Sequence, residues 1–176
     1  VREVGETTIK LPNIATQLAR LHTRFVIPPS LKEYYTTPSL WQQLDDWLNQ
    51  AQTNTYRTTH DTDRAAALPL ATLADEFAWM KKEVIPETSS VVYCHNDVLA
   101  ANILYKEGDD NAGARLQLID FEYGGCNYAC FDIANHWNEY AGGPPHMTTP
   151  HYEWIPTDEQ QNLFCRTYLL EAAADE

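Results

Sequence analysis

A few polar residues set between β-prone segments restrict the fold of this chain more than any other feature. His95, Asp97 and Asn102 give the spacing HxDxxxxN directly after the β-prone run 91–93. A second apolar run ends at Asp120, 18 positions beyond Asn102. A hairpin between the two segments would return Asp120 to a place opposite the loop that carries Asp97 and Asn102.

This order of residues suits a phosphoryl-transfer site. Such a site needs one carboxylate that orients the attacking hydroxyl and oxygen ligands that hold Mg²⁺ against the phosphates. Asp97, Asn102 and Asp120 can supply these groups. The structural alternative is that His95 and Asp97 cap a turn, Asn102 closes a loop and Asp120 ends a strand. The combined spacing favours the phosphoryl-transfer interpretation over the turn interpretation, which would suffice for any one of these residues alone.

Apolar periodicity predicts that most of the remaining chain is helical. We expect a first helix that Asn13 caps and that ends before Pro28, a second from Ser39 to Ala51, and a third from Pro69 to Val84. Residues 53–64 are polar and aperiodic, and this composition predicts a loop. Two more helices are expected, one at 128–140 and one after Thr157, whose spacing to Gln160 fits a capping box.

Three short β-prone runs predict a small sheet beside these helices. We expect strands at 91–93, 103–105 and 116–121, with a hairpin turn at 108–113 and a polar turn at 122–127. The fold class that follows is α+β, mostly helical, with a small β-hairpin at the catalytic site.

Composition narrows the class of protein. The net charge of −13 makes a nucleic-acid partner improbable, because such binding depends on Lys and Arg. No apolar run approaches the roughly 20 residues of a transmembrane helix. The four cysteines lack CxxC spacing, and this absence favours reduced thiols in a cytoplasmic protein.

Two segments of the chain resemble the paired signatures of choline and ethanolamine kinases. They are CHNDVLAANILY, residues 94–105, and QLIDFEYGGCNYACFDIANHWNEY, residues 117–140. The resemblance implies the C-terminal lobe of a protein-kinase-like fold, with ATP and Mg²⁺ as cofactors and a small amino alcohol as substrate. It also leaves open a homodimer of the full-length protein.

The resemblance assigns roles residue by residue. Asp97 corresponds to the catalytic base, Asn102 and Asp120 to metal ligands, and His95 to a support of the catalytic loop. Glu122 is either a further metal-site carboxylate or an exposed side chain. Two apolar residues near the metal ligands form either a floor beneath adenine or the core of the hairpin: Leu104 and Ile119.

The charge of the site region suits a cationic substrate. Between residues 93 and 142, eight acidic side chains stand against two basic ones. The resemblance gives Tyr123 a cation-binding ring face and Glu139 a countercharge, with Asn138 as a polar neighbour. Ordinary packing or a solvated helix face is the alternative for each. The helix end NHWNEYAGG resembles ethanolamine kinases more than choline kinases, and we therefore expect ethanolamine to be preferred.

A glycine-rich phosphate loop and its lysine precede the catalytic loop in kinases of this kind. Here only Gly5 precedes Gly108. We therefore expect residues 1–176 to form a single domain, a kinase-like C-terminal lobe without the nucleotide lobe and without the final helices, and inactive alone. The alternatives are a choline-preferring kinase, an aminoglycoside-type phosphotransferase, and a non-catalytic pseudokinase or interaction module.

Overall fold

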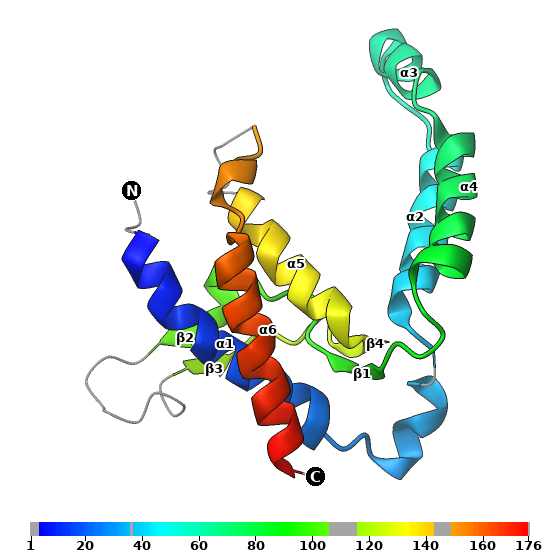
Figure 1. The fold of residues 1–176 in the computed structure, drawn as a ribbon. Helices are drawn as coiled ribbons and strands as arrows, with labels where there is room; N and C mark the ends of the chain where they lie inside the picture. The colour runs from blue at the N-terminus through cyan, green and yellow to red at the C-terminus, as the bar shows by residue number, and fades with distance from the viewer. Residues whose placement is uncertain (1–3, 36, 106–115, 143–148, 176) are drawn as a thin grey trace. The chain divides into compact units, whose positions relative to one another are not determined.

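The structure is a computed structural model that describes residues 4–35, 37–105, 116–142 and 149–175 (Figure 1). Internal contacts divide the chain into two compact units. Unit 1 comprises residues 1–37 and 91–176, and unit 2 comprises residues 38–90. These contacts describe each unit by itself. That residues 1–176 form a single lobe therefore remains a prediction.

The described part of unit 1 contains the α-helices α1 (Val4–Arg24), α5 (Ala129–Gly142) and α6 (Asp158–Ala172). Helix α1 packs along α6, and the two lie side by side in Figure 1. A core of buried apolar side chains fills the space between these helices and the strands. Its members are Leu11, Ile14, Ala15, Leu18, Val98, Leu116, Leu118 and Phe164.

The strands among the described residues of unit 1 form two antiparallel pairs. Strand β1 (Val91–Cys94) pairs with β4 (Gly125–Tyr128), and Cys94 lies opposite Gly125. Strand β2 (Ile103–Tyr105) pairs with β3 (Leu116–Leu118), and Ile103 lies opposite Leu118. The candidate catalytic loop, residues 95–102, runs from β1 to β2 and ends in the 3₁₀ turn Ala100–Asn102.

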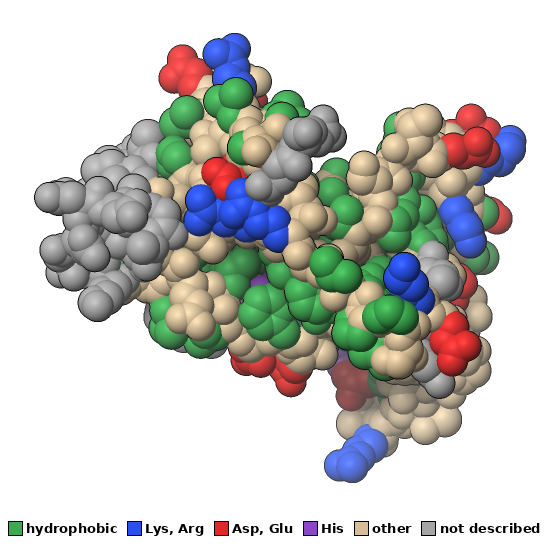
Figure 2. Space-filling model, turned by 90° about the horizontal axis from the view of Figure 1, so that it is seen from below, with side chains coloured by type: hydrophobic (Ala, Val, Ile, Leu, Met, Phe, Trp, Pro, Cys, Tyr) green, Lys and Arg blue, Asp and Glu red, His purple; other side chains and the backbone are tan. Residues whose placement is uncertain are grey.

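Ion pairs add to the apolar contact between α1 and α6 at the surface. Arg20 Nε lies 2.6 Å and Arg24 Nη2 lies 2.9 Å from Glu171 Oε1. Figure 2 shows one face of the chain, on which basic and acidic side chains lie at the surface among hydrophobic ones. Exposed pairs of this kind contribute little to stability, so the buried core is the main support of the helix pair.

Unit 2 is a helical hairpin with a short helix at its tip. It contains α2 (Ser39–Thr53), α3 (Thr59–Ala66) and α4 (Leu70–Trp79), which continues into a π-helical turn at Met80–Val84. Helices α2 and α4 pack against each other. Trp41 is buried at this contact, and the ammonium of Lys81 lies 5.6 Å from the centre of its ring. Cation–π contact of this kind stabilises the pair modestly.

Short 3₁₀ segments occur at Pro29–Tyr34, Tyr152–Trp154 and Ala173–Asp175. Thr157 caps α6 through the predicted capping box with Gln160. Within the described residues, no helix is long and apolar enough to cross a membrane.

Several helix, loop and strand boundaries differ from those predicted from local sequence. The first helix does not begin at Asn13: α1 begins at Val4 and contains Pro12, because the buried residues that follow Pro12 hold this turn against the core. The loop expected at 53–64 contains most of α3, which Thr58 caps by accepting the N–H of Asp61.

The turn expected at 122–127 was also partly wrong, because β4 occupies residues 125–128 through its pairing with β1. Strand β3 ends at Leu118 and not at Phe121. The predicted hairpin turn at 108–113 lies outside the described residues.

Candidate active site

The catalytic loop brings Asp97 and Asn102 into direct contact. Asn102 Nδ2 donates to Asp97 Oδ2 at 3.0 Å and to the Asp97 carbonyl at 2.9 Å. Asn102 is buried, and its backbone N–H bonds the Leu99 carbonyl. The five-residue spacing of the motif therefore acts as predicted, because one turn of 3₁₀ helix folds the loop back on Asp97.

The backbone of Ile119 ties the second polar segment to this loop. Its N–H donates to the Asn102 carbonyl at 3.0 Å, and its carbonyl accepts from His95 Nε2 at 2.9 Å. Asp120 follows at once, with an exposed side chain and a φ of 65°. A non-glycine residue in the left-handed region is uncommon and is kept only where its surroundings fix it. These bonds place Asp120 next to the loop, as the hairpin argument expected.

His95 lies beneath the loop and does not reach the surface. It is 0% exposed, and its ring lies 4.5 Å from that of Phe121, between centres. Since Nε2 donates to Ile119, the imidazole joins the loop to the segment that leads to Asp120. A support of the loop remains the role that we predict for His95, and its burial fits this prediction.

Asn96 joins the loop to several other segments of unit 1. Its Nδ2 donates to the Tyr123 carbonyl, its Oδ1 accepts from Asn127 Nδ2, and its carbonyl accepts from Asn135 Nδ2. Its φ of 64° is also left-handed. Bonds to three other segments thus hold the backbone immediately before Asp97 in a conformation that the chain would seldom adopt alone.

Asp132 on α5 holds the start of the catalytic loop, and sequence reasoning counted it only as one acid among eight. Its side chain is fully buried, and its two oxygens accept the backbone N–H groups of His95, at 2.7 Å, and Asn96, at 2.6 Å. A buried carboxylate needs such donors, because an unpaired charge in the interior is costly. One signal could have found it: Asp132 interrupts the apolar run of an amphipathic helix.

Glu139 faces the catalytic loop from one turn further along α5 than Asn135. Burial raises the pKa of this carboxyl, and the negative charge of Asp97 raises it further. The side chain still reaches the surface. Two carboxylates that repel each other at one site form an attractive place for a cation.

The other predicted substrate contacts are exposed. Tyr123 is 55% exposed and lies in the turn 121–124, which the Gly124 N–H closes onto the Phe121 carbonyl at 2.9 Å. Gly124 is required here, because a Cβ would meet the Tyr93 hydroxyl and the Phe121 carbonyl. Asn138 is also exposed, on α5 beside Glu139.

The remaining predicted residues divide between surface and partial burial. Glu122 lies in the turn after Asp120 and not in a strand, so strand alternation no longer argues that it points the same way as Asp120. Leu104 is 50% exposed, whereas its strand neighbours Ile103 and Tyr105 are partly buried, and Ile119 is partly buried too. Leu104 is therefore outside the core and is available to a ligand.

The donor set of the loop fits a magnesium ion. Asn102 commits its Nδ2 to Asp97, and this leaves its Oδ1 as the atom that could bind a metal. The carboxylate of Asp120 supplies a second oxygen. Amide and carboxylate oxygens are the ligands that Mg²⁺ prefers in proteins.

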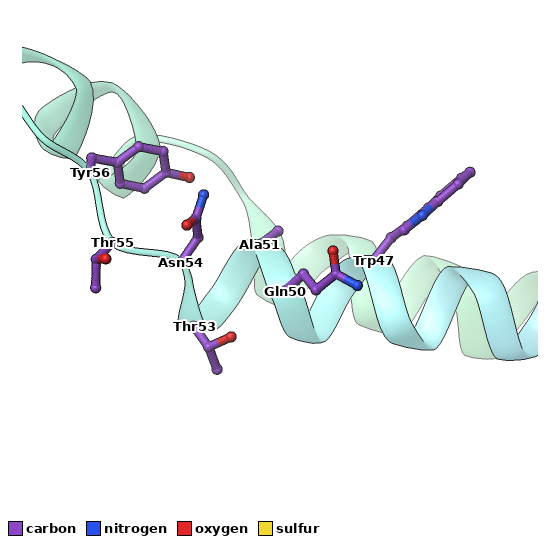
Figure 3. Close-up of a pocket in the computed structure, with 7 residues that line it drawn as sticks. All are labelled: Trp47, Gln50, Ala51, Thr53, Asn54, Thr55 and Tyr56. Carbon is purple, nitrogen blue, oxygen red and sulfur yellow. The ribbon is translucent and has the colours of Figure 1, made fainter.

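A pocket elsewhere in the chain contains none of these residues. It lies where α2 ends, in unit 2, and Figure 3 shows Trp47 and Tyr56 at its two ends, with the Trp47 ring pointing away from Tyr56. The other lining residues are Gln50, Ala51, Thr53, Asn54 and Thr55. The candidate site residues all lie between residues 95 and 139 and so belong to unit 1.

A family model described as choline/ethanolamine kinase matches residues 2–175. The chain belongs to this family. The resemblance seen in two short segments is confirmed, and the family match extends over nearly the whole chain. The predicted fold class, the C-terminal lobe of a protein-kinase-like fold, is confirmed with it.

Individual members of this family are also similar to the chain in sequence and in structure. Ethanolamine kinase 2 of Mus musculus is 33% identical over 157 residues, 89% of this chain and 36% of its own length. The choline/ethanolamine kinase of Homo sapiens is 42% identical over 113 residues, 62% of this chain and 28% of its own length. The solved Plasmodium vivax ethanolamine kinase has a TM-score of 0.77 and 25% identity, covering 96% of this chain and 46% of its own. The chain thus spans less than half the length of these relatives.

Proposed function

We propose that this chain carries the catalytic half of a kinase that transfers the γ-phosphoryl group of ATP to the hydroxyl of ethanolamine. The main support for this proposal is the hydrogen bond between Asn102 and Asp97, with Asp120 held beside them through the backbone of Ile119. One carboxylate and two oxygen ligands in this order suit phosphoryl transfer.

In the proposed reaction, Asp97 accepts a hydrogen bond from the substrate hydroxyl and orients its oxygen. An O–P bond forms to the γ-phosphorus, the bond to the β-phosphate oxygen breaks, and ADP leaves. The hydroxyl proton passes to the Asp97 carboxylate. Asn102 keeps this carboxylate in place through its Nδ2. A magnesium ion, when bound by Asn102 and Asp120, would neutralise charge on the phosphates.

Glu139 is the proposed countercharge for the substrate ammonium. Its raised pKa reflects burial and the nearby charge of Asp97, and a cation bound between the two would relieve this repulsion. A primary ammonium donates three hydrogen bonds, for which Glu139 and Asn138 are acceptors. The ring of Tyr123 offers a cation–π face.

Ethanolamine is the substrate we propose first, because several of the relatives are named ethanolamine kinases. Choline is the alternative, since the human relative with 42% identity is named choline/ethanolamine kinase. Half-exposed Leu104, with Ile119, is the proposed surface beneath adenine. We further propose a cytoplasmic enzyme, which the four free cysteines support.

The test uses the longer protein that carries this chain. Asp97→Asn should keep the fold and lower kcat by roughly 10²-fold, as expected when a positioned base is lost. Asp75→Asn, an exposed acid on α4, is the matched control and should leave kcat unchanged. Near-normal turnover in folded Asp97→Asn protein would remove Asp97 from the mechanism.

The same assay compares ethanolamine with choline. A kcat/KM that favours choline tenfold or more, about 1.4 kcal/mol in transition-state binding, would overturn the substrate while leaving the kinase proposal intact. No turnover of either alcohol by the wild-type protein, with ATP and magnesium present, would favour a non-catalytic role.

A further inference from the structure

Four segments of unit 1 meet around one buried side chain, the imidazole of His22 near the end of α1. Its side chain is 0% exposed, and both ring nitrogens have partners. Nδ1 lies 2.9 Å from Tyr168 Oη on α6, and Nε2 lies 3.1 Å from Asp132 Oδ2 on α5. Because Asp132 also holds the N–H groups of His95 and Asn96, a continuous hydrogen-bonded path leads from α6 to the residues before Asp97.

The chemistry of the groups sets the direction of these bonds. A carboxylate oxygen only accepts, so the N–H of His22 Nε2 donates this hydrogen bond to Asp132 Oδ2. Burial, with nearby negative charge, raises the pKa of Tyr168 to about 12, and the phenol therefore keeps its proton at neutral pH. The phenol can then donate to Nδ1 in the tautomer that carries its N–H on Nε2. In this arrangement every donor meets an acceptor, and three N–H groups hold the Asp132 carboxylate.

Cys94 lies beside this pair, and the three side chains, whose ligand atoms lie within 4.8 Å of one another, could in principle bind a metal. Each of them already has a partner in the protein. Cys94 Sγ approaches the Tyr128 carbonyl at 3.5 Å, and burial raises the pKa of its thiol and so disfavours the thiolate that a metal needs. The group is therefore better described as a satisfied hydrogen-bond network than as a metal site.

We propose that His22 is a positioning residue of the phosphoryl-transfer site, which fixes the Asp132 carboxylate and, through it, the backbone from which Asp97 projects. The inference rests on the proposed kinase function and adds a residue of α1 to it. The left-handed φ of Asn96 makes this support necessary, because the loop conformation depends on the bonds that hold it.

Two substitutions separate positioning from packing. His22→Leu fills a similar volume but cannot donate to Asp132. His22→Gln retains a side-chain N–H that can lie near the position of Nε2. Leu18→Ala is the control for general destabilisation, since Leu18 is buried one turn earlier on the same helix, in the apolar core. Tyr168→Phe removes only the hydroxyl at the far end of the path.

The first measurement is amide hydrogen exchange at His95 and Asn96, which needs no catalysis. His22→Leu should speed exchange at these two amides by tenfold or more relative to the rest of unit 1, and His22→Gln should restore most of the protection. Leu18→Ala should speed exchange throughout unit 1 without singling them out. Equal protection of the two amides in folded His22→Leu and wild-type protein would overturn the inference.

The second measurement is turnover by the longer protein that carries this chain. His22→Leu should lower kcat roughly tenfold per folded molecule with little change in KM, because misplacing a catalytic group slows the chemical step. His22→Gln should recover most of kcat, and Leu18→Ala should leave it unchanged. A kcat unchanged by His22→Leu would contradict the positioning role.

A replacement variant and a readout that is independent of activity keep failure of this inference distinguishable from misfolding and from failure of the proposed function. If His22→Leu does not fold, His22→Phe takes its place, because its ring also fills the site but cannot donate to Asp132; selective exposure of the His95 and Asn96 amides then supports the inference, and unchanged protection overturns it. If the wild-type protein phosphorylates neither amino alcohol, the proposed function fails, and the exchange measurement still decides whether His22 supports the loop.

Discussion

The two units of the chain stabilise themselves in different ways. Unit 1 buries an apolar core together with several polar side chains, among them His22, His95, Asn102, Asp132 and His136. Unit 2 buries one residue, Trp41, and keeps its other side chains partly or fully exposed. All the predicted site residues lie in unit 1.

This contrast follows from the backbone conformations that each unit contains. Two left-handed residues, Asn96 and Asp120, and the catalytic loop, residues 95–102, need many directed hydrogen bonds. The buried polar groups of unit 1 provide these bonds. His136 is a further case: its Nδ1 bonds the Val98 carbonyl at 2.8 Å, and burial lowers its pKa, so it holds the loop as a neutral imidazole. Unit 2, a pair of amphipathic helices, needs only apolar contact between its helices.

The largest expected effect is at Asp132. Asp132→Ala should lower the free energy of unfolding by about 3–5 kcal/mol, because it leaves buried N–H groups without a partner. Urea denaturation followed by circular dichroism measures this loss. Asp75→Ala in unit 2 should stay within about 0.5 kcal/mol of wild type. Similar values for the two variants would mean that the polar network of unit 1 does not carry its stability.

A smaller and more local effect is expected at Trp41. Trp41→Ala should weaken the α2–α4 contact by about 3 kcal/mol, the low end of the range for large-to-small substitutions. Amide exchange should rise in α2 and α4 and stay unchanged in α1 and α6. Trp47→Ala is the matched control, since this residue of the same helix is 57% exposed. Equal loss of protection in α6 would show that the two units do not unfold separately.

The smallest effect concerns Glu139. The pKa of its carboxyl is raised above the ordinary 4.5 in the folded state. Between the unfolded-state and folded-state pKa values, the folded state therefore binds more protons than the unfolded state, and stability falls as the pH rises through this interval. Glu139→Gln should remove this slope and make the protein slightly more stable than wild type at neutral pH. Thermal unfolding between acidic and neutral pH tests this.

Glu76→Gln, on the exposed side of unit 2, is the control for Glu139→Gln. A Glu139→Gln protein that is less stable than wild type at neutral pH would contradict the repulsion between Glu139 and Asp97. The proposed role of Glu139 as a countercharge predicts, in addition, that this substitution raises KM for the amino alcohol.

The sequence by itself determined the elements whose signals are local. The apolar stripes of α2 and α4, the capping box of α6, strands β1 and β2, and the pairing of Asp97 with Asn102 all depend on residues within a few positions of one another. Helical periodicity, caps and a five-residue loop spacing are read from such neighbours, and the choline/ethanolamine kinase family could be recognised from the same segments.

Only the tertiary structure decided the features that join distant parts of the chain. Gly125–Tyr128 has weak strand character and becomes β4 because β1 pairs with it. Pro12 lies inside α1 because the buried residues after it hold the turn. Asp132 receives its donors from residues 22, 95 and 96. The burial that makes these donors necessary, and the contacts that supply them, exist only after the chain has folded.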